Sequence, residues 1–210
     1  MEDVLDVYAH PYDPQRPQVC VDEHPVQLIK EKRTPLPATA DQPERYDYEY
    51  QRNGTRNLFM LFQPLGGWRH VKVTQRRTKK DFAHCLRNLV DVHFPEADQV
   101  VLVTDNLNTH SPVALYETFA PAEAKRILDR VEWHYTPKHG SWLDMAEIEI
   151  GVLQEQCLAD RIPDEATLRR EITAWEHARN TQRATVNWQF TATNARTKLK
   201  RLYPVISNSP

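Results

Sequence analysis

The run Val100-Val101-Leu102-Val103-Thr104 constrains the fold of this chain more than any other segment. It is almost continuously apolar, which is typical of a strand buried on both faces of a sheet, and it ends at Asp105. A second apolar stretch, Val19-Cys20-Val21, ends at Asp22 in the same way. A buried carboxylate without a partner loses several kcal/mol of solvation. Each of these carboxylates therefore needs a compensating charge, which a divalent cation would supply.

A third carboxylate, Glu147, follows Ser141-Trp142-Leu143 in a segment that is typical of the start of a helix. Carboxylate oxygens are the ligands that Mg²⁺ prefers. If Asp22, Asp105 and Glu147 converge, they would hold a pair of metal ions suited to phosphodiester chemistry.

The remaining pattern predicts an α/β fold. We expect an extended N-terminal arm over residues 1–17, a strand over 18–29, and two or three antiparallel strands within 45–75, with a hairpin turn at Asn53-Gly54. Helices are expected over 78–93, 111–128, 144–158 and 163–180, and strands over 100–104 and 131–135. Antiparallel strands followed by alternating strands and helices indicate a mixed sheet with helices on both faces.

Composition limits the class of protein. The 210 residues are 40% hydrophobic and 27% charged, which is ordinary for a soluble globular protein. No apolar run approaches the ~20 residues of a membrane span, and no signal peptide is recognisable, so we expect a cytoplasmic protein without a membrane partner. The three cysteines are widely separated, which argues against a disulfide framework or a zinc site.

The net charge of −2 does not by itself suggest nucleic acid. Positive charge is nevertheless concentrated locally, in the segment 76–80 and in the C-terminal tail. The residues concerned are Arg76, Arg77, Lys79, Lys80, Lys198, Lys200 and Arg201. They are either solvated surface or a DNA-binding surface.

Three segments taken together resemble a known family. They are Val21-Asp22-Glu23, Thr104 through His110, and Tyr135 through Glu147, joined by the tail Asn187-Trp188-Gln189-Phe190 through Pro204. They resemble the catalytic domain of bacterial insertion-sequence transposases allied to the Tc/mariner group, which are Asp-Asp-Glu transposases with a ribonuclease-H-like fold. The resemblance extends from about Pro17 to Pro204.

The resemblance implies roles for individual residues. Asp22, Asp105 and Glu147 match the three catalytic, metal-binding carboxylates, and the cofactor would be two Mg²⁺ ions, with Mn²⁺ as a substitute. Residues 18–160 would form the catalytic domain, and 161–210 a helical extension with a basic tail. Asp144 departs from the family, which more often has Asn at this position, and a metal-binding role for Asp144 is left open.

Glu149 is an alternative to Glu147. At ~100° per residue, Glu149 falls within the apolar arc formed by Met145, Ile148 and Val152, whereas Glu147 falls outside it. A charged residue on the packed face could point at the metal ions, so helical geometry leaves the choice open. The family resemblance favours Glu147.

Two loops carry further candidates. Asn106, Asn108 and His110 could hydrogen-bond Asp105 or a DNA phosphate, or serve only as loop and cap residues. In the second loop, Lys138, His139 and Trp142 could hold a phosphate and an unstacked base. For Trp142 we favour the alternative that it anchors the core.

The resemblance implies a DNA transposase that cleaves at transposon ends and transfers the strand to target DNA. Little chain precedes Asp22, so we expect DNA recognition to come from an upstream-frame helix-turn-helix partner, and a homodimer is a further expectation. The active protein would lie in the bacterial cytoplasm with the nucleoid. Two alternatives remain: a catalytically silent remnant that binds DNA or protein, and a ribonuclease-H-like nuclease without strand transfer.

Overall fold

The computed structural model describes residues 1–43, 45, 47–138 and 140–203, and a mixed five-stranded sheet lies at its centre. The strand order is β3-β2-β1-β4-β5. Pairing is antiparallel between β3, β2 and β1, and parallel between β1, β4 and β5. The strands are β1 (Gln18–Glu31), β2 (Tyr50–Gln63), β3 (Trp68–Thr74), β4 (Val100–Thr104) and β5 (Val131–Tyr135). The predicted mixed sheet is therefore confirmed.

Side-chain alternation along the central strands divides the core into two layers, because successive side chains in a strand point to opposite faces. In β4, Val100 and Leu102 join one cluster, whereas Val101 and Val103 join the other. In β1, Val21 belongs to the first cluster and Cys20 to the second. The sheet is thus buried on both faces, as the apolar run in β4 predicts.

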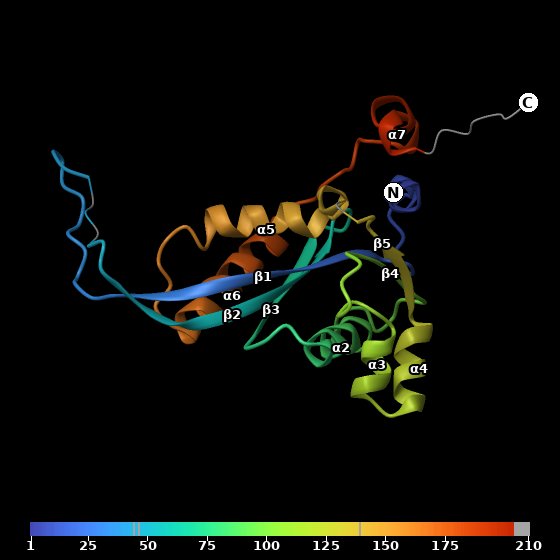
Figure 1. Ribbon diagram of the computed structural model, residues 1–210, viewed down its shortest axis with the longest axis horizontal. Coiled ribbons are helices and arrows are strands. Elements are labelled where there is room, and N and C mark those ends of the chain that lie inside the picture. Colours follow the sequence, from blue (N-terminus) through green and yellow to red (C-terminus); the bar gives the residue numbers. More distant parts are fainter. Residues whose placement is uncertain (44, 46, 139, 204–210) are drawn as a thin grey trace, which may run out of the picture.

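Helices cover both faces, as predicted (Figure 1). One face carries α2 (Lys79–Asn88), α3 (Val113–Thr118) and α4 (Pro121–Asp129). The other carries α1 (Glu2–Ala9), α5 (Met145–Gln156) and α6 (Glu165–Thr181), and α7 (Ala192–Lys198) packs on α1. Short turns of helix complete the chain: η1 (Leu89–His93), η2 (Ser141–Leu143) and η3 (Lys200–Leu202). No helix in the described part of the chain is long and apolar enough to span a bilayer.

Local sequence explains where several helices begin. Thr78 and Asp81 form a reciprocal capping box at the start of α2. Asp144 caps α5 by accepting a hydrogen bond from the Ala146 N–H, and Asp164 caps α6 in the same way. These side chains satisfy N–H groups that have no partner inside the helix.

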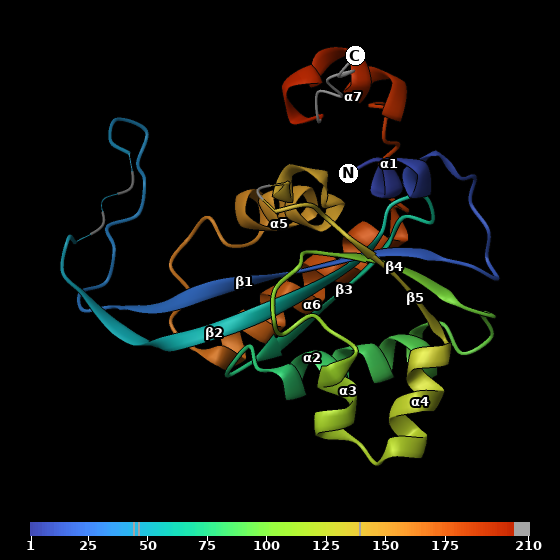
Figure 2. The ribbon, with the colours of Figure 1, turned by 45° about the vertical axis from the view of Figure 1, so that its right-hand side comes forward.

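The paired strands β1 and β2 extend well beyond the rest of the sheet and carry the described part of the connection between them away from it (Figure 2). β1 pairs with β4 only from Gln18 to Val21. From Asp22 onward, β2 is the only strand of the described residues that pairs with β1. Asp22 therefore marks the point where the parallel part of the sheet ends.

Two expected features of the first half are wrong. Residues 2–9 form α1 instead of an extended arm, because Val4, Leu5 and Tyr8 lie on one helical face and are buried. Asn53-Gly54 is not a hairpin turn: it lies within β2, where two residues face the single residue Leu28 of β1 in a β-bulge. Gly54 has φ +90°, a conformation that glycine adopts without strain.

Two predicted helices are modified. The helix expected over 111–128 is divided into α3 and α4, because Pro121 cannot continue a helix and starts a new one at its first turn. The helix expected over 78–93 ends as α2 at Asn88 and continues as a π-helical turn, η1.

The connection between β2 and β3 contains Gly66-Gly67, which makes the turn there.

Candidate active site at the carboxyl ends of the parallel strands

Asp22 and Asp105 lie side by side at the carboxyl ends of two parallel strands. The last residue pair between these strands is Val21–Thr104, so Asp22 and Asp105 occupy the next position on each. Neighbouring strands are ~4.8 Å apart. In β1, Asp22 alternates with Val21 and therefore faces the same side of the sheet as Cys20, the side covered by α5. This position matches the crevice in which open α/β sheets bind ligands.

Burial concentrates negative charge at this edge. Desolvation, together with the charge of the neighbouring Asp105 carboxylate, raises the pKa of Asp22 to about 6 despite a hydrogen bond from the Glu23 N–H, which lowers it. Burial also raises the pKa of Asp144 well above its usual range, with a contribution from the charge of Asp22. Asp144 is 2% exposed, and its Oδ2 has no hydrogen-bond partner among the described residues. Ionisation of Asp22 and Asp144 is therefore disfavoured at this edge when no cation is bound.

His110 connects Asp105 to a fourth carboxylate, Glu23. Its Nδ1 hydrogen-bonds Asp105 and its Nε2 lies 2.8 Å from Glu23 Oε1, while the ring is fully buried. Burial lowers the pKa of His110, but the hydrogen bonds and charges of Asp105 and Glu23 outweigh it and raise the pKa to about 9. Of the alternatives left open for His110, the structure shows the hydrogen bond to Asp105. A protonated His110 holds the Asp105 carboxylate in one orientation.

Glu147 lies in the first turn of α5, directly after the Asp144 cap. Its N–H donates to the Asp144 carbonyl at 3.1 Å, and its side chain is exposed. Within the described ranges, no group of three or more His, Cys, Asp or Glu side chains is arranged closely enough to hold a metal ion. The structure thus places Asp22 and Asp105 together with Asp144 nearby, and leaves Glu147 on the adjoining surface of α5.

Glu149 occupies a different environment from Glu147. It is fully buried, as its place on the apolar side of the helix predicts. Its carboxylate is ion-paired with Arg69 of β3 at 2.9 Å and with Arg179 of α6 at 3.0 Å. The predicted apolar face is wrong in one respect, because Ile148 is 42% exposed and the helix turns Ala146, Ile150 and Leu153 inward instead.

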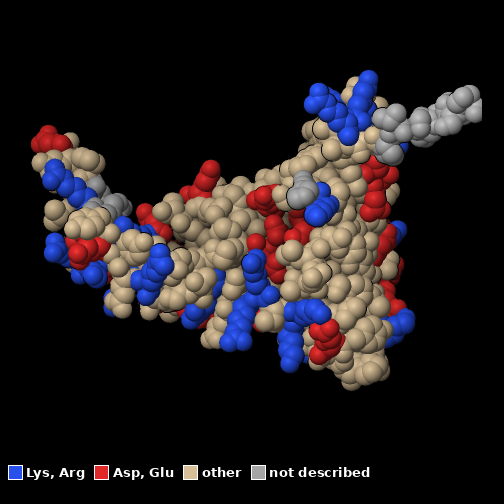
Figure 3. Space-filling model, in the orientation of Figure 1, with Lys and Arg blue, Asp and Glu red and all other residues tan. Residues whose placement is uncertain are grey.

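The basic candidates are spread around the acidic edge. Figure 3 shows acidic side chains gathered between the start of α5 and α2, with Lys and Arg along the lower margin and again at α7. The exposed members are Arg76, Arg77, Lys80, Lys138, Lys198, Lys200 and Arg201. Lys79 instead pairs with Glu117 at 2.7 Å. His139 and Pro204 lie outside the described residues. Asn106 and Asn108 are exposed in the loop after Asp105.

Trp142 does not anchor the core, contrary to our expectation. It is 44% exposed and stacks on Trp188 in the segment that follows α6. Its neighbour Leu143 is fully buried and fills the core position in its place.

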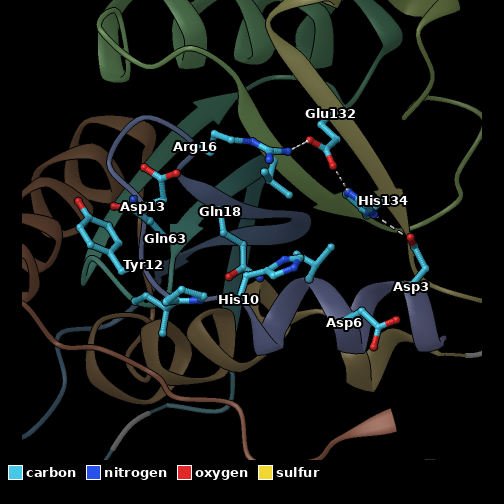
Figure 4. A pocket seen from close by; sticks show the side chains of 14 residues that line it. Asp3, Asp6, His10, Tyr12, Asp13, Arg16, Gln18, Gln63, Glu132 and His134 are labelled. Atoms are coloured by element: carbon cyan, nitrogen blue, oxygen red, sulfur yellow. Dashed lines mark hydrogen bonds and ion pairs between the residues drawn. The ribbon is translucent and has the colours of Figure 1, made fainter.

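A cavity of about 310 Å³ lies at the opposite end of the strands (Figure 4). Its walls include Gln18, Val101 and Glu132, which stand at the starts of β1, β4 and β5. His134 lies between Asp3 and Glu132 there, at 2.9 and 3.2 Å. The cavity is thus separate from the carboxylates, and parallel strands place their functional crevice at the other end.

The sequence reasoning missed the roles of three residues. No role was assigned to Glu23 beyond its place next to Asp22. Because successive side chains of a strand point to opposite faces, two consecutive acidic residues indicate a carboxylate on each face of the sheet. Arg69 and Arg179 are separated from Glu149 by 80 and 30 residues (149 − 69 and 179 − 149), and no local signal connects them. The ion pairs of Arg69 and Arg179 with Glu149 depend on the folded arrangement of β3, α5 and α6.

Comparison with known proteins agrees with this geometry. The sequence profile of a family described as DDE superfamily endonuclease matches residues 17–169. Comparison with curated proteins gives no match. Among solved structures, the chain is similar to the Mos1 mariner paired-end complex with Mn, with a TM-score of 0.57, 16% identity, and coverage of 86% of this chain and 54% of that chain. It is also similar to the Mos1 strand transfer complex, with a TM-score of 0.55, 15% identity, and coverage of 86% and 55%.

The structural likeness confirms the predicted ribonuclease-H-like fold. The chain spans little more than half the length of these solved proteins.

Proposed function

The chain belongs to the DDE superfamily endonucleases, and from this premise we propose that it is the catalytic domain of a metal-dependent DNA transposase. The observation that carries the proposal is the adjacent placement of Asp22 and Asp105 at the carboxyl ends of β1 and β4. Two carboxylates side by side repel each other, and a protein retains such a pair where a cation brings them together.

The residues present fit divalent metal ions. The raised pKa of Asp22 and the unpartnered, buried Oδ2 of Asp144 both show that the charged forms of these carboxyl groups lack a compensating partner, which a cation would supply. Asp22, Asp105 and Glu147 would hold two Mg²⁺ ions, for which Mn²⁺ would substitute. When bound, such ions stabilise the charge on the attacking and leaving oxygens of a phosphodiester. His110 would keep Asp105 in a fixed orientation, as it does in the structure.

Glu147 is the third ligand in this proposal. Glu149 already accepts hydrogen bonds from Arg179 and is ion-paired with Arg69, so turning it toward a metal would remove this carboxylate from the buried Arg69 and the partly buried Arg179. The Oδ1 of Asp144 accepts a hydrogen bond from the Ala146 N–H, and only its Oδ2 has no partner among the described residues. Glu147 is exposed on the first turn of α5, and in this proposal a change of its side-chain rotamer would bring its carboxylate to the metal ions.

DNA is the proposed substrate, in the form of transposon ends and target DNA. The exposed basic residues on two sides of the acidic edge, in the 76–80 segment and in α7 and η3, would contact its phosphates. Joining two DNA ends calls for two catalytic domains, so a homodimer belongs to the proposal. Recognition of the terminal repeats would rest with a helix-turn-helix partner, because phosphate contacts alone carry no sequence information.

One observation favours a second candidate, a catalytically silent domain that binds DNA or protein. The described carboxylates do not form a converged group of three. Activity would then require DNA or metal ions to draw Glu147 inward, and a chain in which that never happens would bind without cleaving.

Cleavage of supercoiled plasmid in Mg²⁺ or Mn²⁺ tests the proposal. Wild type should nick the plasmid and EDTA should abolish nicking. Asp105→Asn should be inactive, because it keeps the size of the side chain and removes the charge that the ions need. Asp129→Asn, an exposed control on α4, should be fully active.

Cleavage that persists in EDTA or in Asp105→Asn would refute the metal mechanism. If wild type binds plasmid but never cleaves it, the silent candidate is correct. Joining of a labelled oligonucleotide 3′ end to the plasmid distinguishes a transposase from a simple nuclease.

A further inference from the structure

Three aromatic side chains form a partly exposed platform on the surface beside the candidate active site. The ring of Trp142 stacks on that of Trp188, with centroids 6.3 Å apart and an interplanar angle of 25°. Phe190 meets Trp142 edge-on at 5.8 Å. We call Trp142, Trp188 and Phe190 the aromatic platform. Trp142 is 44% exposed, so part of its ring remains in contact with solvent.

Hydrogen bonds and a contact with Tyr8 fix the position of the platform. The Trp188 Nε1–H donates to the Phe190 carbonyl at 2.7 Å, and Tyr8 of α1 packs against the Trp188 ring at 5.3 Å. Tyr8 in turn donates its hydroxyl to the Leu143 carbonyl at 2.6 Å, next to Trp142. Three distant segments thus fix the orientation of one exposed ring.

The platform lies at the catalytic edge of the sheet. Trp142 belongs to η2, in the connection that leaves the carboxyl end of β5, beside the end of β4 that carries Asp105. It precedes Glu147 by five residues in the chain, with the Asp144 cap between them. A group bound on the platform would therefore lie next to the candidate metal ligands.

One cation lies against the platform, and three more are exposed in the adjoining segments of the chain. Lys198 lies over the ring of Phe190, with Nζ 5.9 Å from the centroid. Lys138 is exposed in the same connection as Trp142, and Lys200 and Arg201 are exposed in η3, directly after α7. Figure 3 shows basic side chains gathered at α7. Flat aromatic rings next to cations match the two parts of a nucleotide, its base and its phosphate.

We propose that the aromatic platform binds an unpaired base of the DNA strand end held at the active site, with Lys138 and Lys198 contacting the flanking phosphates. The inference rests on the proposed function, since it deepens that function by naming where a single-stranded part of the substrate lies. Every base presents a stacking face, so the platform would accept any base. The clustered cations favour DNA over a protein partner as the occupant.

Binding of a DNA hairpin with a short single-stranded overhang tests the proposal. The overhang carries 2-aminopurine, whose fluorescence falls on stacking, and binding is measured in EDTA so that no cleavage occurs. Wild type should quench the probe. Trp142→Ala should weaken binding of the overhang by at least about fivefold, the lower bound for losing one base stack. Trp142→Phe should retain most of the quenching.

Controls separate stacking from general damage. A blunt hairpin of the same duplex sequence should bind wild type and Trp142→Ala equally. Tyr116→Ala, which removes an equally exposed aromatic ring on the opposite face of the sheet, should bind the overhang like wild type. If Trp142→Ala does not fold, Trp142→Leu keeps apolar volume without an aromatic face and should show the same loss.

The proposal is overturned if wild type neither binds the overhang nor quenches its fluorescence, or if Trp142→Ala binds the overhang as tightly as wild type. It is also overturned if Trp142→Ala and Trp142→Leu lose affinity for the blunt hairpin as much as for the overhang. These outcomes differ from a failure of the proposed function, which shows as absence of metal-dependent cleavage by wild type. A silent domain could still stack a base, and an active transposase could lack this contact.

Discussion

Glu149 of α5 and Arg69 of β3 form an ion pair in which Oε1 and Nε are 2.9 Å apart and both side chains are fully buried. Arg179 of α6 pairs with the same carboxylate. One acidic residue thus connects a helix, a strand and a second helix. Glu149 is buried, whereas Glu147, two residues earlier in the same helix, is exposed. The two glutamates therefore have different roles, since Glu149 pairs with arginines in the interior and Glu147 is in contact with solvent.

The first prediction compares these two glutamates. Glu149→Gln should lower the free energy of unfolding by about 3–5 kcal/mol, because it removes the carboxylate that pairs with the buried Arg69 and leaves Arg69 and the partly buried Arg179 repelling each other. Glu147→Gln should change it by less than about 0.5 kcal/mol, since its side chain is exposed. Urea denaturation measures both. Equal stability of the two variants would show that the buried pair contributes nothing to the fold.

The second prediction concerns His110. In metal-free protein its imidazole should titrate near pH 9, which NMR of the ring nitrogens can follow. A folded pKa above the unfolded value of ~6.5 means that the stabilising effect is fully present below pH ~6.5 and disappears as the pH rises through 9. The stability difference between wild type and His110→Gln should follow this curve. A ring that titrates at its ordinary pKa would contradict the contacts with Asp105 and Glu23.

The third prediction concerns Asp22. Its folded pKa of about 6 exceeds the unfolded value, so its stability contribution is present at low pH and is lost as the pH rises through 6. At pH 7 without metal, Asp22→Asn should therefore raise the free energy of unfolding by about 1–3 kcal/mol. Added Mg²⁺ should stabilise wild type but not this variant. A destabilised Asp22→Asn protein would show that the carboxylate is not under electrostatic strain.

The fourth prediction concerns two glycines. Gly54→Ala should destabilise the protein by about 1–2 kcal/mol, because φ +90° in the β2 bulge is unfavourable for a residue with a Cβ. Gly151→Ala should instead stabilise it by about 0.5–1 kcal/mol, since Gly151 lies within α5 and an added Cβ meets no atom within 4 Å. Thermal unfolding of the two variants distinguishes these effects. The bulge assignment fails if Gly54→Ala is neutral.

Local signals were sufficient for the short buried strands and for the capped helices. β4 and β5 begin and end at the expected residues, because β4 is a continuous apolar run and β5 alternates Val131, Trp133 and Tyr135 with polar residues. The adjacency of Asp22 and Asp105 followed from the same signals, once both strands were taken as parallel neighbours.

Features that depend on a partner strand or helix could not be predicted in this way. Asn53-Gly54 has the composition of a turn, and only its pairing opposite Leu28 makes it a bulge. The apolar face of α1 was visible in the sequence but was outweighed by the prolines that follow it. The burial of Glu149 was expected, but the two arginines that balance its charge come from distant segments.

The most direct test of the central claim is a crystal structure of the protein with DNA and Mg²⁺. The account predicts oxygens of Asp22, Asp105 and Glu147 at about 2.0–2.1 Å from the ions, the distance that Mg²⁺ demands. Glu149 should remain paired with Arg69. Ions bound by Glu149, with Glu147 in solvent, or ions bound away from Asp22 and Asp105 would contradict it.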